Sequence, residues 1–141
     1  MKKPAIIIMI LIMGLVLTYG CGGGTVKAEL GEQFTLKVGQ EATITGEGLS
    51  ITFDRVISDS RCPANVVCIQ AGEARFEVTL TKGGTSQTLT LVEPGLSGPS
   101  GMSAFGYHVS GHLLPYPLDG VTTEPGDYYV QLEVFKAATS L

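Results

Sequence analysis

The sequence predicts an all-β fold: an antiparallel β-sandwich or open barrel of about six or seven strands with one disulfide. Three observations predict it. Several runs alternate apolar and polar residues with a period of two, and none sustains the 3.6-residue period of a helix. The 141 residues include 19 glycines, which fits many tight turns. Two close cysteines, Cys62 and Cys68, lie between two of the alternating runs.

An export signal is expected at the start of the chain. Met1-Lys2-Lys3 is followed by an apolar run over residues 5–17, which is the layout of a secretory signal. The glycine before Cys21 and the three glycines after it resemble a bacterial lipobox, from which Thr18 and Tyr19 depart. We therefore expect Cys21 to be lipidated and to attach the protein to a membrane.

Three segments follow from this pattern. We expect residues 1–20 to be a lipoprotein-type signal peptide, residues 21–32 to form a flexible tether that starts at the lipidated cysteine, and residues 33–141 to form a single β domain. An uncleaved anchor and a soluble secreted product are the alternatives, since the apolar run is shorter than the roughly 20 residues that span a bilayer. The expected location is extracytoplasmic, at the cell envelope.

Seven runs are expected to be strands. They are residues 34–38, 42–45, 49–57, 74–80, 85–92, 105–113 and 128–134. In the run over residues 74–80, Ala74, Phe76, Val78 and Leu80 should face the core. The alternation slips after Asp54, which predicts a β-bulge, and Lys82-Gly83-Gly84 predicts a hairpin turn. Residues 93–104 are expected to form a long mobile loop, and the prolines at 115 and 117 should end the strand before them.

The stretch over residues 59–74 holds the densest chemistry. Cys62 and Cys68 enclose Pro63 and Asn65, which favour a turn, so we expect a disulfide that closes a small loop. With Cys21 used for a lipid, no odd thiol remains. The alternatives are two reduced core cysteines, a metal site and a redox pair. The spacing differs from the Cys-x-x-Cys of thiol oxidoreductases.

No arrangement of residues predicts catalysis or a cofactor. His108 and His112 are the two histidines. On a strand they share a face about 13 Å apart, so we expect them to face solvent. A copper- or zinc-handling protein that uses them, together with Met102, is one alternative. An enzyme that uses a neighbourhood of Asp59, Arg61 and Glu73 is another.

The charge limits the kinds of partner. Without Lys2 and Lys3, seven basic and 13 acidic residues remain, a formal charge of about −6. This excess argues against nucleic acid and against anionic lipid headgroups as partners.

One stretch resembles a known group of proteins. Asp59-Ser-Arg-Cys-Pro63, then Cys68 and Ala71-Gly-Glu-Ala74, are similar to a motif of small, uncharacterised bacterial lipoproteins and secreted proteins. Gln70 stands where that motif often has an aromatic residue. The resemblance implies an exported β domain with a disulfide, and it implies no activity.

The expected function is therefore a lipid-anchored binding or interaction module of the cell envelope, without enzymatic activity. The loops over residues 59–70, 93–104 and 114–127 should carry the contacts, because β domains usually place function on loops that strands position. Asp59, Arg61 and Asn65 are the candidate contact residues for an envelope protein or glycan. A peptidase-inhibitor-like module is a further version of this hypothesis.

Overall fold

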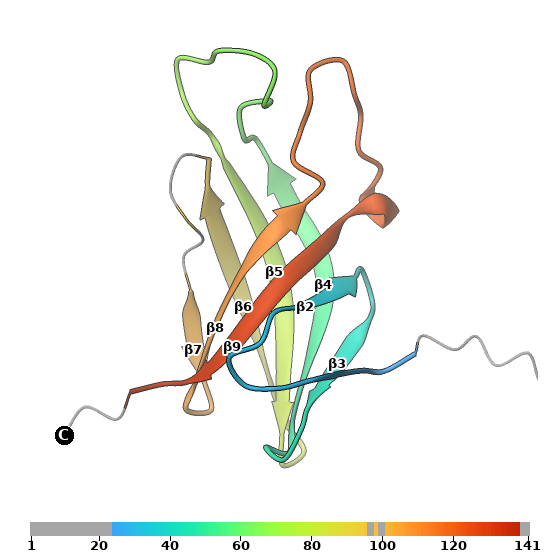
Figure 1. Cartoon of the computed structure of the whole chain (residues 1–141), viewed down its shortest axis with the longest axis vertical. Coiled ribbons are helices and arrows are strands. Elements are labelled where there is room, and N and C mark those ends of the chain that lie inside the picture. Colours follow the sequence, from blue (N-terminus) through green and yellow to red (C-terminus); the bar gives the residue numbers. More distant parts are fainter. Residues whose placement is uncertain (1–23, 96–97, 99–100, 139–141) are drawn as a thin grey trace, which may run out of the picture.

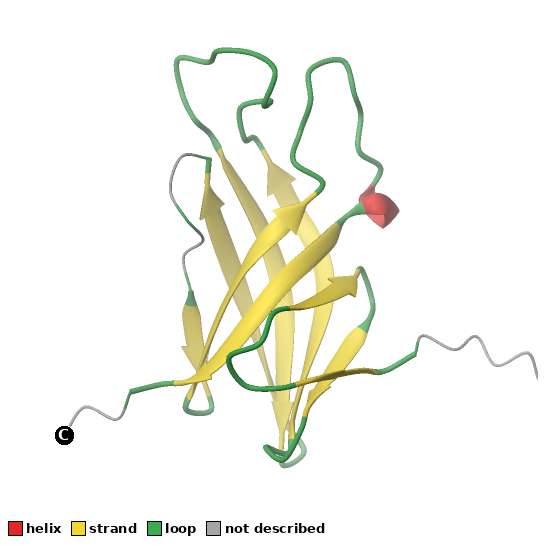
Figure 2. Cartoon of the chain, in the orientation of Figure 1, coloured by secondary structure: helices red, strands yellow, loops and turns green. Residues whose placement is uncertain are grey.

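The structure, a computed structural model, describes residues 24–95, 98 and 101–138. It confirms the predicted all-β class and the disulfide between Cys62 and Cys68. Two open sheets lie face to face as a sandwich (Figure 1, Figure 2). This described part of the chain holds nine strands, rather than the expected six or seven.

The two sheets contain five and four strands. The larger sheet has the order β1 (Val26–Ala28), β3 (Glu41–Ile44), β4 (Leu49–Asp59), β5 (Glu73–Lys82) and β6 (Thr85–Pro94). The smaller sheet has the order β2 (Phe34–Lys37), β9 (Tyr129–Lys136), β8 (Tyr107–Leu114) and β7 (Met102–Ala104). A short 3₁₀ turn, η1 (Pro125–Asp127), precedes β9. All pairs are antiparallel except β1 with β3.

The core lies between the sheets and consists of every second residue of the strands. In β5, the four residues predicted to face inward are all buried: Ala74, Phe76, Val78 and Leu80. Phe76 meets Phe53 of β4 edge to face, with ring centroids 6.1 Å apart. The alternation that predicted the strands is thus the burial pattern of a half-exposed sheet.

The two additional strands correct two expectations. Residues 26–28 were expected in the tether, but they form β1 in parallel with β3, and Ala28 is buried. Residues 93–104 were expected to be one loop, but β6 continues through Pro94 and β7 pairs with β8. Both new strands have three residues, which is too short to show an alternation in sequence.

The predicted irregularities are confirmed. The register between β4 and β5 shifts between Phe53 and Arg55 and again between Val56 and Ser58. The hairpin turn at Gly83 and Gly84, which both have positive φ, joins β5 to β6. The strand β8 ends at Leu114, directly before the first proline of its loop.

The long loops gather at one end of the sandwich. The connection from β4 to β5 and the connection from β8 to η1 both lie at the top of Figure 1. Within the described ranges, no helix is long and apolar enough to cross a bilayer. The expected signal peptide and Cys21 lie outside the described residues.

The opposite end of the sandwich is closed by a small charged cluster. The hydroxyl of Tyr107 donates to the Glu47 carboxylate over 2.6 Å, and Lys136 Nζ lies 3.1 Å from the same group. The hydrogen bonds from Tyr107 and then Lys136 lower the pKa of Glu47 below its ordinary value of 4.5. The folded state therefore favours the ionised carboxylate.

This shift predicts a pH dependence of stability. The contribution of Glu47 is complete above about pH 4.5 and is lost as the pH falls through the lower pKa of the folded state. In urea unfolding, Glu47→Gln should lower the free energy of unfolding at pH 6, and the deficit should shrink towards pH 3. A deficit that is equal at both pH values would contradict the role of the charged carboxylate.

Candidate functional site

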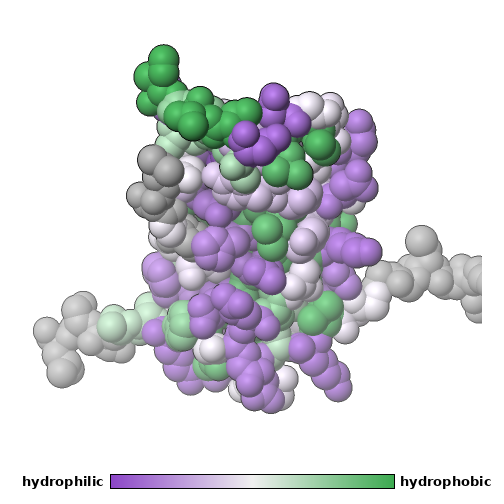
Figure 3. All heavy atoms as spheres, turned by 45° about the horizontal axis from the view of Figure 1, so that its top comes forward, coloured by the Kyte–Doolittle hydropathy of each residue, from purple (hydrophilic) through white to green (hydrophobic). Residues whose placement is uncertain are grey.

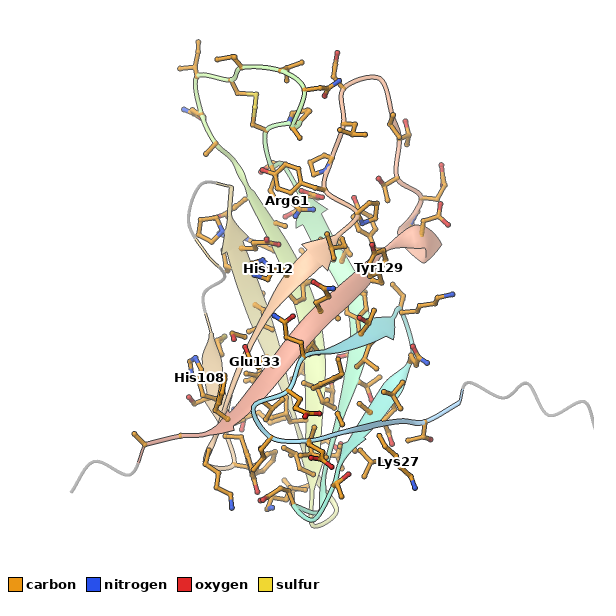
Figure 4. The ribbon with its side chains drawn as sticks, viewed as in Figure 1. Lys27, Arg61, His108, His112, Tyr129 and Glu133 are labelled. Atoms are coloured by element: carbon orange, nitrogen blue, oxygen red, sulfur yellow. A yellow bond between two sulfur atoms is a disulfide. The ribbon has the colours of Figure 1, made fainter. Side chains whose placement is uncertain are left out.

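A buried arginine joins the two sheets at the loop end. Arg61 follows β4, is only 3% exposed, and points inward beneath the loops (Figure 4). Its Nε and Nη2 donate to the two carboxylate oxygens of Asp59 over 2.9 and 2.7 Å. Its Nη1 donates to the Leu113 carbonyl over 2.8 Å, and Nη2 also reaches the Pro115 carbonyl over 3.3 Å. The guanidinium lies over the ring of Tyr116, 4.7 Å from its centroid.

Glu93 completes the cluster from β6. Its Oε2 lies 3.2 Å from Arg61 Nη1 and accepts a hydrogen bond from the Leu113 amide over 2.8 Å. Its Oε1 is 2.9 Å from His112 Nδ1. Arg61 therefore uses all five of its N–H donors. A β6 carboxylate is thereby linked to β8 in the other sheet.

The electrostatics of the cluster keep the arginine charged. Burial alone would lower the pKa of Arg61, but the hydrogen bonds and charge of Asp59, with the charge of Glu93, outweigh it and raise the pKa. The pKa of Tyr128 is raised by burial and by the charge of Asp59. The bidentate Asp59–Arg61 pair has the fork geometry that makes such contacts strong.

The base of the disulfide loop is closed by backbone pairing. The Ser60 amide donates to the Glu73 carbonyl, and the Cys62 amide donates to the Ala71 carbonyl, each over 2.8 Å. Gly72 has a φ of +65°, and a Cβ there would overlap the carbonyl oxygen of Ser60. The motif thus needs glycine at this position because the two arms of the loop cross closely.

The disulfide loop is fastened to its neighbour. Cys62 and Cys68 have Cα atoms 5.9 Å apart. The Ala64 amide donates to the Pro117 carbonyl over 3.0 Å, and the Asn65 side-chain oxygen accepts from the Asp119 amide over 2.7 Å. The loops that follow β4 and β8 therefore form one connected end.

That end presents an apolar surface to solvent, which we call the apolar tip. Its members are aliphatic side chains from the two fastened loops: Val66, Val67, Ile69, Leu118 and Val121. Val67 and Ile69 are 102% and 106% exposed, and Val121 is 61% exposed. Hydrophobic side chains gather at the loop end in Figure 3. Complete exposure of neighbouring aliphatic residues on a braced loop is the unusual feature here.

The three predicted contact residues differ in how far they are exposed. Arg61 is buried and the Asp59 side chain is nearly so, which corrects the expectation that both face a partner. The reason is that each satisfies the charge of the other beneath the loop. Asn65 is exposed, but its side-chain oxygen is engaged by the Asp119 amide. Glu73 instead pairs with Arg75 at the surface, away from the Asp59–Arg61 pair.

The exposed aliphatic residues were missed. A signal for them exists, because Val66-Val67-Cys68-Ile69 is apolar without alternation and overlaps a seven-residue disulfide ring. A ring so small cannot fold its side chains back into a core. Glu93 was missed as well, because it was assigned to a loop rather than to the buried end of β6.

The histidines lie on β8 and are both partly exposed (Figure 4). His108 Nδ1 contacts the Ser103 hydroxyl over 3.1 Å, and His112 contacts Glu93. Met102 pairs with Val109 on the neighbouring strand. Among the residues that the structure describes, no three histidine, cysteine, aspartate or glutamate side chains form a group that could hold a metal.

Comparison with protein-family models, with characterised proteins and with solved structures found no match. The charged groups are buried and mutually satisfied, which suits bracing, and the exposed groups are aliphatic, which suits contact with another apolar surface.

Proposed function

We propose that the chain is a membrane-anchored binding module of the cell envelope that acts without catalysis. In this proposal residues 1–20 direct export, Cys21 carries the lipid, and the β-sandwich presents the apolar tip. The observation that carries it is the full exposure of Val67 and Ile69 on a loop closed by a disulfide. Proteins rarely expose aliphatic side chains together unless a contact uses them.

The brace beneath the tip supports this proposal. The disulfide, Arg61 and the Asn65–Asp119 hydrogen bond fix the two loops before any contact is made. A loop that is already ordered loses little conformational entropy on binding. The tip is thus built as a contact surface and not as a mobile connection.

The alternatives draw less support. A copper- or zinc-handling role would use His108 and His112, but His108 is hydrogen-bonded to the Ser103 hydroxyl and His112 to the Glu93 carboxylate, so the two histidines have different partners. A peptidase-inhibitor-like role fits a projecting braced loop, and it differs from our proposal only in the identity of the partner.

Photo-crosslinking in the native envelope tests the proposal. A photoreactive amino acid at Val67 should give adducts with envelope components in intact cells. The same amino acid at Thr88, an exposed residue of β6, is the matched control and should give few or none. Equal crosslinking at the two positions, or none at either, would overturn the tip as the contact surface.

A separate measurement tests the lipid anchor. Mass spectrometry of the native N-terminus should find a chain that begins at an acylated Cys21. An intact Met1 would reject the lipoprotein part of the proposal and leave the role of the tip to the crosslinking result.

A further inference from the structure

We propose that the apolar tip inserts into the outer layer of a lipid bilayer, so that its partner is lipid hydrocarbon. This inference rests on the proposed binding function and specifies the partner. It follows from the residue types of the tip, from its charge, and from the position of the chain that leads to Cys21.

The residue types favour hydrocarbon over a protein pocket. Protein interfaces concentrate their binding energy in tryptophan, tyrosine and arginine, and valine and leucine are under-represented there. The tip consists of three valines, one isoleucine and one leucine. Such side chains offer no hydrogen bonds and no flat ring surface for specific recognition. Fluid acyl chains accept them without shape complementarity.

The charge of the tip permits insertion. From Cys62 to Gly72 the sequence has no charged side chain, and Asp119 is the one charged residue between Leu114 and Thr123. Arg61 lies beneath the tip with its charge neutralised. Insertion of the disulfide loop therefore takes no charged side chain into the bilayer, and the exposed carboxylate of Asp119 is the one charge of the tip that must stay in the headgroup layer. Because the domain as a whole is acidic, neutral lipids should be preferred over anionic ones.

The described chain begins at one side of the domain, beside the middle of β4 and below the loop end. Gly24 is hydrogen-bonded to Gln40, in the turn whose Gly39 amide bonds to the Phe53 carbonyl. From Phe53, β4 runs six residues to Asp59, about 20 Å, and the disulfide loop follows. Cys21 is three residues before Gly24, so a lipid on it would hold Gly24 within about 10 Å of the bilayer.

A domain that is attached to the bilayer through Cys21 by so short a segment meets the membrane along one side. In Figure 1 the described chain begins at the right, and the loop end is at the top. A domain that lies tilted on the membrane brings the start of β1 and the apolar tip to the surface together. The tether supplies a high local concentration, so a shallow insertion of a few aliphatic side chains is sufficient.

A tryptophan probe tests the inference. The protein has no tryptophan, so Val67→Trp gives a single reporter. The chain from Cys21 onward contains every described strand, and Cys21 is its one cysteine outside the disulfide. This chain is coupled through Cys21 to a maleimide phospholipid in phosphatidylcholine vesicles. The coupling replaces the lipid anchor, so the test does not depend on whether cells acylate Cys21. The indole emission of the Val67→Trp variant should move to shorter wavelength and be quenched by lipids brominated on their acyl chains.

The matched control is Thr88→Trp, on the edge strand opposite β1, which should keep an aqueous emission spectrum and escape quenching. Equal quenching at positions 67 and 88 would overturn the inference, as would an unshifted emission from position 67. If the indole at position 67 stays in water on these vesicles and crosslinking from the same position in cells captures a protein, the partner is a protein pocket. The proposed function would then stand without the lipid.

Partitioning gives a second readout. For the untethered domain, Val67→Ser with Ile69→Ser should lower partitioning into phosphatidylcholine vesicles by about tenfold for each side chain. Addition of anionic lipid should weaken binding, and salt should have little effect on neutral vesicles. Binding that rises with anionic lipid, or that survives the double substitution, would contradict hydrocarbon insertion.

Discussion

Replacement of Arg61 by alanine should lower the free energy of unfolding by about 3–5 kcal/mol. The change removes the guanidinium that stands between Asp59 and Glu93 and leaves two carboxylates in a buried site. It also leaves the carbonyls of Leu113 and Pro115 without their donor. Urea unfolding followed by circular dichroism measures the loss directly.

Two further variants separate the buried cluster from a general effect of arginine. Arg75→Ala removes a solvent-exposed partner of Glu73 and should cost no more than about 1 kcal/mol. Combining Arg61→Met with Asp59→Asn and Glu93→Gln removes the unpaired charges and should recover much of the stability. An Arg61→Ala variant as stable as Arg75→Ala would refute the bracing role.

Removal of the disulfide is expected to have the second largest effect. Cys62→Ser with Cys68→Ser opens a seven-residue ring, for which the chain-entropy estimate is about 2.4 kcal/mol. The fold should persist, because the core lies between the sheets and the backbone pairs at Ser60 and Cys62 close the loop at its base.

The same loss should appear when the wild-type protein is unfolded under reducing conditions, and the double variant should not respond to reductant. Limited proteolysis should then cut the variant between residues 62 and 68, a region that the intact ring protects. An unchanged stability together with an unchanged cleavage pattern would show that the ring is not what orders the loop.

Local pattern was sufficient to predict most of the fold. The alternation in β5 predicted its buried face residue by residue, and the slip after Asp54 predicted a real register shift. The strands β1 and β7 could not be found this way, because three residues show no period. Their existence depends on pairing with distant strands that a local pattern does not contain.

The site was harder to predict for the same reason. Aspartate and arginine within a cysteine-rich loop suggest an exposed functional motif. Whether Arg61 is buried depends on Glu93 and on the Leu113 carbonyl, which are 32 and 52 residues away. The exposure of Val67 and Ile69 has a signal in the small disulfide ring, but the exposure of Leu118 and Val121 is identified only once the core is known to be filled by other residues.

The disulfide ring has a consequence for variation of the sequence. Between Cys62 and Cys68 no side chain belongs to the core, and only the Ala64 amide and the Asn65 side chain fasten the ring to the next loop. The ring can therefore exchange its residues without disturbing the sandwich. In this sense the domain is a display scaffold on which a different short peptide, closed by the same two cysteines, would present a different surface.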